Sequence, residues 1–333
     1  MKITYKGITQ NSSIECSLTD AEHQHYKELF YAKPDQNEVD KELKSIYKGS
    51  SQMSKTYYMY LNDIAAKCIG PGASWSIEDA LKYKPIVEYL VAKGRSCQKC
   101  FGDVSTPNQF RSIIRLGGIR YCTQLPRFPM KTIDMLLDKY TVNGVYYDFS
   151  CGWGARMLSA MHKGIKYIGT DPNYLLTERL EQIKNRYDEV NNVNTDVTIY
   201  TQGAEKYIPQ LENSVGFAFS SPPYFDLENY KIGDQSYKDG MSYQDWLDSF
   251  IRPIVKNCYR YIVNNGYFGI NIKNTKAYTM LDDCKKIIEE EGFELYAIEM
   301  LNNIKRVHGD AKTNGKCVKI NRDEQILIFK KSK

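Results

Sequence analysis

Long apolar runs are missing from this sequence of 333 residues. No stretch reaches the roughly 18 apolar residues that a membrane-spanning helix needs, and the opening segment MKITYKGITQNSS lacks the apolar core of a signal peptide. We therefore expect a soluble cytoplasmic protein without a membrane partner. The hydrophobic share of 42% is nevertheless large enough for one α/β core and a smaller accessory region.

Histidine and regularly spaced cysteines are also scarce. The chain has 4 histidines, and neither a Ser, His and Asp pattern nor a pair of carboxylates indicates a hydrolytic site. The cysteine count of 9 is odd, which favours reduced thiols over disulfides. Cys97 and Cys100 form a C-x-x-C and Cys122 follows, but no fourth ligand is evident, so we expect no bound metal.

Hydrophobic periodicity divides the chain near residue 122. Helical patterns dominate the first part, as in residues 18–32 and 76–94, where Ser76 is a candidate N-cap. Beyond residue 144, short β-rich segments alternate with helical ones. These segments cover residues 145–150, 166–171, 197–203, 215–221, 266–273, 293–301 and 324–331.

The alternation predicts an α/β fold with a doubly wound, mostly parallel, seven-stranded sheet in residues 123–333. Residues 1–122 are expected to form a largely helical N-terminal extension, which is a candidate region for target recognition. The boundary falls at the Pro-containing stretch 124–129, where prolines interrupt regular structure.

A glycine turn follows the first predicted strand. The segment DFSCGWGAR runs from Asp148 to Arg156, and its glycines let the backbone lie against a ligand. Such a turn also occurs where a strand merely reverses into a helix. The next strand ends at Asp171, whose carboxylate is placed to accept hydrogen bonds from a ribose diol. The third ends at Gly203–Glu205, which line an adenine pocket unless Glu205 is a surface acid.

The segment SSPPYF, from Ser220 to Phe225, follows the fourth strand and is the most informative motif in the chain. Consecutive prolines have no N–H to donate, so they form a rigid loop at the carboxyl edge of the sheet. An exocyclic amine of a base is a poor nucleophile until hydrogen-bond acceptors draw its N–H groups out of conjugation. The Ser221 hydroxyl and the Pro222 carbonyl are suitable acceptors, and Tyr224 offers a flat face for an extruded base. The predicted catalytic residues are Ser221, Pro222, Pro223 and Tyr224.

The order of DFSCGWG, TDP, SPPY and NIK resembles the amino-methyltransferases of DNA over roughly residues 123–330. The resemblance implies a Rossmann-like methyltransferase fold, S-adenosylmethionine as cofactor, DNA as partner and a cognate restriction endonuclease as a candidate second partner. It implies methyl transfer to the exocyclic amine of a flipped base, with S-adenosylhomocysteine as product. The cofactor residues that it implies are Phe128, Pro129, Asp148, Ser150, Gly152, Gly154, Asp171, Pro172, Gly203, Ala204, Glu205 and Ser220.

The base is less clearly specified than the reaction. Ser221 at the first position of the motif slightly favours cytosine N4 over adenine N6, although the cofactor motifs precede SPPY and many N4-cytosine enzymes have the reverse order. RNA guanine-N2 and protein glutamine-N5 methyltransferases carry related loops, usually with Asn or Asp in place of Ser221. A catalytically silent nucleic-acid-binding protein of the same fold is the alternative outside enzymology, and the intact motifs argue against it.

Basic residues indicate where DNA would lie. Lys and Arg outnumber Asp and Glu in residues 93–131 and again from residue 300 onward, a pattern typical of phosphate-binding surfaces and also of ordinary solvated ones. The polar loop 226–243 predicts either a lid over the flipped base or a plain surface loop. The residues expected to contact DNA are Arg111, Arg115, Arg120, Phe225, Lys312 and Lys316.

Overall fold

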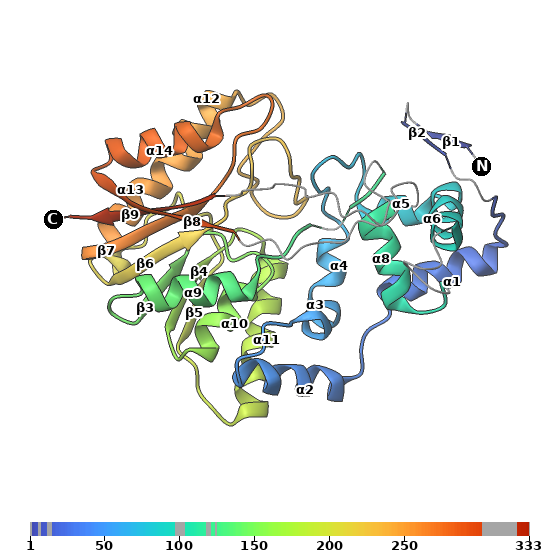
Figure 1. Ribbon diagram of the computed structural model, residues 1–333, viewed down its shortest axis with the longest axis horizontal. Helices are drawn as coiled ribbons and strands as arrows, with labels where there is room; N and C mark the ends of the chain where they lie inside the picture. The colour runs from blue at the N-terminus through green and yellow to red at the C-terminus, as the bar shows by residue number, and fades with distance from the viewer. Residues whose placement is uncertain are drawn as a thin grey trace.

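The computed structural model describes residues 2–5, 8–11, 15–96, 104–117, 121–123, 125–301 and 325–332. A large sheet with helices on both faces forms one side of the molecule, and helices from the first part of the chain form the other (Figure 1). Within these ranges, no helix combines the length and apolar character needed to cross a membrane.

The predicted strands form one sheet. Neighbouring strands are parallel, except that the last strand of the chain is antiparallel to both of its neighbours. In spatial order the strands are β5 (Val197–Tyr200), β4 (Lys166–Thr170), β3 (Val145–Asp148), β6 (Val215–Ser220), β7 (Ile262–Asn271), β9 (Gln325–Lys331) and β8 (Phe293–Met300). The predicted doubly wound, mostly parallel, seven-stranded Rossmann-like sheet is therefore confirmed.

Alternate residues of the central strands bury opposite faces of this sheet. Tyr146 and Phe217 pack into a core with α9 (Met130–Tyr140), α10 (Ala155–His162) and α11 (Tyr174–Asn191). Tyr147 and Ala218, one residue further along the same strands, pack with α13 (Arg252–Tyr261) and α14 (Met280–Glu290). Successive side chains of a strand point to opposite faces, so both layers of helices follow from this alternation.

The order of winding reverses between β3 and β6. The chain passes from β3 outward through β4 to β5, then returns to place β6 on the other side of β3. At such a switch point the connecting loops diverge, and they leave a crevice at the carboxyl ends of the strands. The candidate site lies there.

Three helices of the N-terminal part pack directly on the sheet domain. They are α2 (Gln36–Tyr47), α3 (Ser54–Tyr60) and α4 (Asn62–Ala65), and their apolar residues share one core with α10 and α11. Arg186 of α11 also pairs with Asp40 of α2, with Nε 2.8 Å from Oδ1. The domain boundary near residue 122 stays a prediction, and apolar packing crosses it.

Four other helices that the structure describes in the N-terminal part form a core of their own. They are α1 (Asp20–Tyr31), α5 (Ile77–Lys82), α6 (Lys84–Ser96) and α8 (Pro107–Gly117). A hairpin of β1 (Lys2–Tyr5) and β2 (Ile8–Asn11), which the sequence did not predict, adds Ile3 to this core. The prediction of a largely helical extension is confirmed.

One predicted helix is divided in two. Ser76 caps α5 as expected, because its hydroxyl accepts a hydrogen bond from the backbone N–H of Asp79 (3.0 Å). The helical stretch then breaks at Tyr83, whose φ is −100° and ψ is 101°. Pro85 has no N–H and its ring crowds the carbonyl of the preceding turn, which accounts for the break.

Candidate active site

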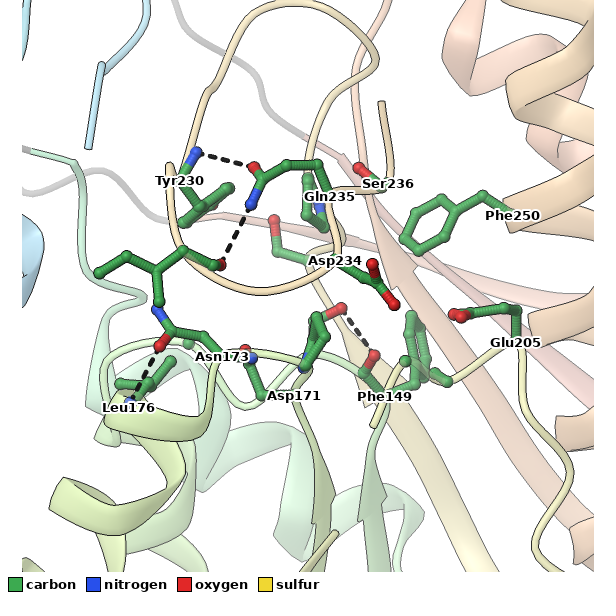
Figure 2. Close-up of a pocket in the computed structure, with 18 of the residues that line it drawn as sticks. Phe149, Asp171, Asn173, Leu176, Glu205, Tyr230, Asp234, Gln235, Ser236 and Phe250 are labelled. Carbon is green, nitrogen blue, oxygen red and sulfur yellow. Dashed lines mark hydrogen bonds between the residues drawn. The ribbon is translucent and has the colours of Figure 1, made fainter. Parts of the chain in front are cut away.

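A pocket of about 250 Å³ opens at the carboxyl ends of the central strands. Residues 226–241, called the covering loop below, form one side of it, and the turns after β3, β4, β5 and β6 form the other (Figure 2). The lining consists of Phe149, Ser150, Gly152, Trp153, Asp171, Pro172, Asn173, Leu176, Gly203, Ala204, Glu205, Ser221, Pro223, Tyr230, Ile232, Asp234, Gln235, Ser236, Lys238, Met241, Ser249 and Phe250.

The glycine turn after β3 is held in a conformation that favours glycine. Gly152 (φ 56°) and Gly154 (φ 76°) both lie in the left-handed region. A Cβ atom on Gly154 would lie 2.8 Å from Cδ2 of Leu180, so the missing side chain also lets the turn approach α11. The backbone N–H of Cys151 donates to the carbonyl of Thr170 (3.0 Å), which fixes the turn against the end of β4.

Asp171 follows β4 and faces the pocket (Figure 2). Its carboxylate accepts hydrogen bonds from the backbone N–H groups of Asn173 (3.0 Å) and Gly152, yet burial raises its pKa to about 6. Asn173 caps α11 by accepting from the N–H of Leu176 (3.2 Å). Its side-chain nitrogen is buried and has no hydrogen-bond partner within the described part of the chain. Asp171 thus offers an acceptor at the pocket wall, and the buried amide of the neighbouring Asn173 holds an unpartnered donor.

The segment Gly203–Glu205 after β5 forms the third part of the wall. A Cβ atom on Gly203 would collide with the Glu205 carboxylate, which folds back over the segment. Asn257 of α13 donates from Nδ2 to the carbonyls of Ala204 and Glu205, both at 3.0 Å. The sequence analysis missed Asn257, because these partners lie 53 and 52 residues away in the chain.

Ser249 and Phe250 reach the pocket from a π-helical segment, η2 (Leu247–Ile251), between α12 (Tyr243–Trp246) and α13. The amide N–H of Arg252 donates to the carbonyl of Leu247, five residues earlier. Pro253 follows at the start of α13, and since it has no N–H it removes one α-helical hydrogen bond at this point. The wider turn brings two lining residues to the site, and the sequence analysis identified neither.

SSPPYF is divided between the pocket and the interior. Ser221 and Pro223 line the pocket, whereas Pro222 and Tyr224 do not. Tyr224 is 9% exposed, and its ring centroid lies 5.9 Å from Nζ of Lys273. The structure therefore brings two of the four predicted catalytic residues to the cavity surface, and their role stays a prediction.

Phe225 lies in the interior, where its ring contacts four other aromatic rings. It is 3% exposed, and the rings around it belong to Tyr237, Tyr243, Trp246 and Tyr278. This burial contradicts the predicted contact of Phe225 with DNA. The aromatic cluster instead anchors the loop that carries Ser221.

Asp148 and Arg156 form a buried ion pair outside the pocket lining. Nε of Arg156 lies 2.8 Å from Oδ2 of Asp148, and the side chains are 6% and 0% exposed. Tyr167 donates from its hydroxyl to the same carboxylate oxygen (3.1 Å). Burial disfavours the charged guanidinium, but the Asp148 carboxylate outweighs this and raises the pKa of Arg156 above its usual value. Asp148 therefore neutralises Arg156, which corrects the prediction that it contacts the cofactor.

Four other predicted cofactor residues also lie outside the pocket lining. The pocket contains Ser150, Gly152, Asp171, Pro172, Gly203, Ala204 and Glu205, but Phe128, Pro129, Gly154 and Ser220 are absent from its lining. Phe128 packs on Phe219, with ring centroids 5.4 Å apart, and Pro129 is the N-cap residue of α9. Ser220 is fully buried at the end of β6. These four support the walls of the site from outside the cavity.

Arg111 and Arg115, two of the residues predicted to contact DNA, lie on α8. Arg111 is 5% exposed and donates from Nε to the carbonyl of Phe30 (3.0 Å), with its guanidinium 3.9 Å from the ring of Tyr58. This position contradicts its predicted contact with phosphates. Arg115 is exposed on α8. Arg120, Lys312 and Lys316 lie outside the described residues, as do Cys97 and Cys100.

The covering loop rests on both parts of the molecule. Asn229 and Ile69 exchange backbone hydrogen bonds (2.8 and 3.1 Å), and the thiol of Cys68 lies 3.4 Å from the carbonyl of Tyr230. At Gly233 (φ 76°) a Cβ atom would lie 2.6 Å from the carbonyl oxygen of Pro172. The loop therefore lies directly on the turn that carries Asp171. The sequence had left open whether this segment covers a site, and the structure puts it there.

The described residues contain no cluster of three or more His, Cys, Asp or Glu that could hold a metal ion. The cysteines that the structure describes are buried free thiols. The site is thus built from carboxylates, amides, hydroxyls and backbone groups, which suits the binding and alignment of a polar organic ligand.

No family model matches the chain. The curated protein named Cathecol O-methyltransferase 1, from Solanum lycopersicum, is 27% identical over 107 residues, which are 32% of this chain and 28% of that protein. The chain thus matches less than a third of the length of that relative.

Two of the similar solved structures carry the name of a methyltransferase. A SAM-dependent O-methyltransferase of Thermotoga maritima has a TM-score of 0.40 and 14% identity, with 61% of this chain and 64% of that chain covered. A geranyl diphosphate methyltransferase in complex with SAM has a TM-score of 0.43 and 12% identity, with 70% and 94% covered. At such values, cofactor and acceptor have to be argued from the chain's own residues.

Proposed function

We propose that this chain is an S-adenosylmethionine-dependent methyltransferase that acts on the exocyclic amine of a DNA base. One observation carries the proposal. A single pocket at the switch point of the sheet is lined by Asp171, with its free acceptor capacity, and by Ser221 and Pro223 of SSPPYF. A nucleoside-binding wall and an amine-binding loop thus share one cavity.

The lining fits the proposed cofactor. Asp171 would accept hydrogen bonds from the ribose hydroxyls, and the unpartnered side-chain nitrogen of Asn173 would donate to the same part of the ligand. Gly203–Glu205 and Phe250 would hold the adenine, and the backbone at Gly152 would hold the methionine part. When bound, S-adenosylmethionine supplies an electrophilic methyl group. The residues of the protein have to bind and align the cofactor and the target amine.

The protein's own task is to hold and align the target amine. The Ser221 hydroxyl, which lies at the pocket, would accept one of its N–H groups, which helps to free the nitrogen lone pair for in-line attack. No titratable group of the pocket is needed as a base, since the nitrogen loses a proton readily once it is alkylated. Alignment of the amine with the methyl group is then the main source of rate acceleration.

DNA is the proposed partner, with cytosine N4 slightly favoured over adenine N6 because Ser221 stands at the first position of the motif. Lys238 lines the pocket and Lys273 lies exposed beside the ring of Tyr224, so cations are present where a phosphate backbone would pass. Association with a restriction endonuclease stays a prediction from the resemblance.

A small-molecule amine is the second candidate acceptor. The burial of Phe225 and Arg111 removes two of the expected DNA contacts, and the covering loop closes one side of the pocket. A small acceptor that enters the cavity completely would not need a contact with Phe225 or Arg111. RNA bases and protein side-chain amides are further alternative acceptors, because the methyltransferases that act on them carry loops related to SSPPYF.

The proposal is tested by following a labelled methyl group. The purified chain is incubated with methyl-labelled S-adenosylmethionine and separate pools of DNA, RNA, protein and small amines. Label in DNA supports the proposal, whereas label in one of the other pools replaces its acceptor. Cofactor binding without transfer to any pool would favour a silent protein of this fold.

A further inference from the structure

A buried guanidinium lies between the two parts of the candidate site. Nη2 of Arg156 donates to the carbonyl of Ser150 in the glycine turn and to the hydroxyl of Ser220 at the end of β6 (3.2 Å). The Ser220 hydroxyl also lies 3.2 Å from the Ser150 carbonyl, so the three groups close a small network. Asp148 neutralises the charge through Nε.

This network joins segments with different proposed tasks. Ser150 lies in the turn that would hold the cofactor, and Ser220 directly precedes Ser221, which would hold the amine. The two segments are far apart in the chain and adjacent in space, since β3 and β6 are neighbouring strands. A Cβ atom on Gly152 would lie 3.3 Å from Nη2 of Arg156, so the turn also lies directly against the guanidinium.

Stability alone gives little reason for such a network. A buried ion pair stabilises a fold no better than well-packed apolar side chains of similar volume, because both charges lose their hydration. A guanidinium differs from apolar groups in geometry. Its donors are fixed in one plane, so it holds several acceptors at set distances and angles.

We propose that Arg156 is a positioning residue that sets the separation between the methyl donor and the target amine. The inference rests on the proposed function and adds a residue outside the pocket lining. Methyl transfer requires in-line alignment, and a misplacement of about 1 Å can slow such a reaction about a hundredfold, so a small shift between the turn and the loop slows transfer while each ligand still binds. Arg156 therefore acts on the rate constant of transfer rather than on cofactor affinity.

Two variants loosen the network without leaving a buried charge unpaired. Arg156→Lys keeps the charge beside Asp148 but loses the planar fork, and Ser220→Ala removes one acceptor. Ser159→Ala is the matched control, because Ser159 is equally buried, lies in the same helix as Arg156 and does not line the pocket. Each protein is assayed for kcat, for the Kd of S-adenosylmethionine and for Tm.

We expect kcat to fall about tenfold in Ser220→Ala and about a hundredfold in Arg156→Lys, with the cofactor Kd within about threefold of wild type. Ser159→Ala should keep the wild-type kcat. A kcat near wild type in both network variants overturns the proposal. So does a loss of kcat that merely follows a loss of cofactor affinity or Tm, because it would indicate a structural role alone.

A second measurement does not depend on the acceptor. Amide hydrogen exchange should rise in the glycine turn and in Ser220–Phe225 of both network variants, and it should stay unchanged there in Ser159→Ala. If the wild type methylates RNA, protein or a small amine instead of DNA, the proposed function fails, and the positioning role is tested with that acceptor. Unchanged exchange in both segments overturns the positioning role, whatever the acceptor.

Discussion

At the scale of single residues, Asp171 lines the pocket and its charge is expected to respond to pH near neutrality. Burial raises its pKa to about 6, so the carboxyl is ionised above pH 6 and protonated below it. Only the ionised form is a full acceptor for ribose hydroxyls. The affinity for S-adenosylmethionine should therefore fall about tenfold for each pH unit below 6, as titration calorimetry between pH 5 and 8 can measure.

Asp171→Asn provides the control for this pH dependence. It should bind S-adenosylmethionine more weakly than wild type at pH 8 and show no inflection near pH 6. An ionised carboxylate with a raised pKa opposes folding above that pKa, so the variant should also gain more in Tm at pH 8 than at pH 4. A wild-type binding curve that is flat between pH 5 and 8 would exclude Asp171 as the ribose acceptor.

The residues of SSPPYF should separate binding from transfer. Ser221→Ala removes the proposed acceptor of the amine, and we expect kcat to fall at least about a hundredfold with cofactor affinity nearly unchanged. Tyr224→Ala should have a similar effect, whereas Tyr224→Phe keeps the ring and should retain most activity. Single-turnover assays beside calorimetry distinguish the steps. Parallel losses of cofactor binding in Ser221→Ala and Asp171→Asn would show that their roles are not divided in this way.

Among the structural elements, the covering loop offers a matched pair of glycines. Gly233 and Gly240 both have positive φ, but a Cβ atom at Gly233 would meet the carbonyl of Pro172, whereas nothing lies within 4 Å at Gly240. Gly233→Ala should lift the loop from the turn that carries Asp171 and raise the dissociation rate of S-adenosylmethionine about tenfold or more. Gly240→Ala carries the same backbone strain without the clash.

Stopped-flow measurement of cofactor release from Gly233→Ala and Gly240→Ala separates the effect of the clash with Pro172 from the effect of backbone strain. Equal release rates would mean that the covering loop does not retain the cofactor. The loop also exchanges hydrogen bonds with Ile69, so residues of the N-terminal part help to place it. The extension therefore contributes to the site through this element, independently of any contact with a target.

At the scale of the whole molecule, α2 belongs energetically to the sheet domain. Leu43 is fully buried in the core that α2 shares with α10 and α11, so Leu43→Ala should destabilise the protein by about 2–5 kcal/mol. Hydrogen exchange in α10 and α11 should rise. Leu90→Ala makes the same change in the separate N-terminal core and should leave those two helices protected. Protection that survives Leu43→Ala would mean that the sheet domain is stable without α2.

The layered fold could be predicted because the signals are local. A short unbroken hydrophobic run such as residues 145–147 predicts a strand buried on both faces, and Ser76 marks a helix start within its own turn. Side-chain partners could not be predicted in this way. Arg111 looked like a phosphate contact, but it is satisfied by the carbonyl of Phe30, 81 residues earlier in the chain.

The residues of the candidate site could likewise be predicted only where the signal is local in the sequence. Motif residues at strand ends, such as Asp171 and Ser221, reached the pocket, because the ends of parallel strands meet at one edge of a sheet. Asp148 also lies at the end of a strand, yet its carboxylate pairs with Arg156 in the interior. The spacing of the motif does not indicate this burial. Phe250 enters through a π-helical turn, which leaves no periodic signal in the sequence.

The central claim is that the pocket aligns a DNA amine with the cofactor, and one measurement tests it most directly. Unmethylated DNA is treated with the wild-type chain or with Ser221→Ala in the presence of S-adenosylmethionine, digested to nucleosides and analysed by mass spectrometry. We predict N4-methylcytosine or N6-methyladenine with the wild type only, and slightly favour the former. The absence of both methylated nucleosides with a protein that binds S-adenosylmethionine would contradict the claim.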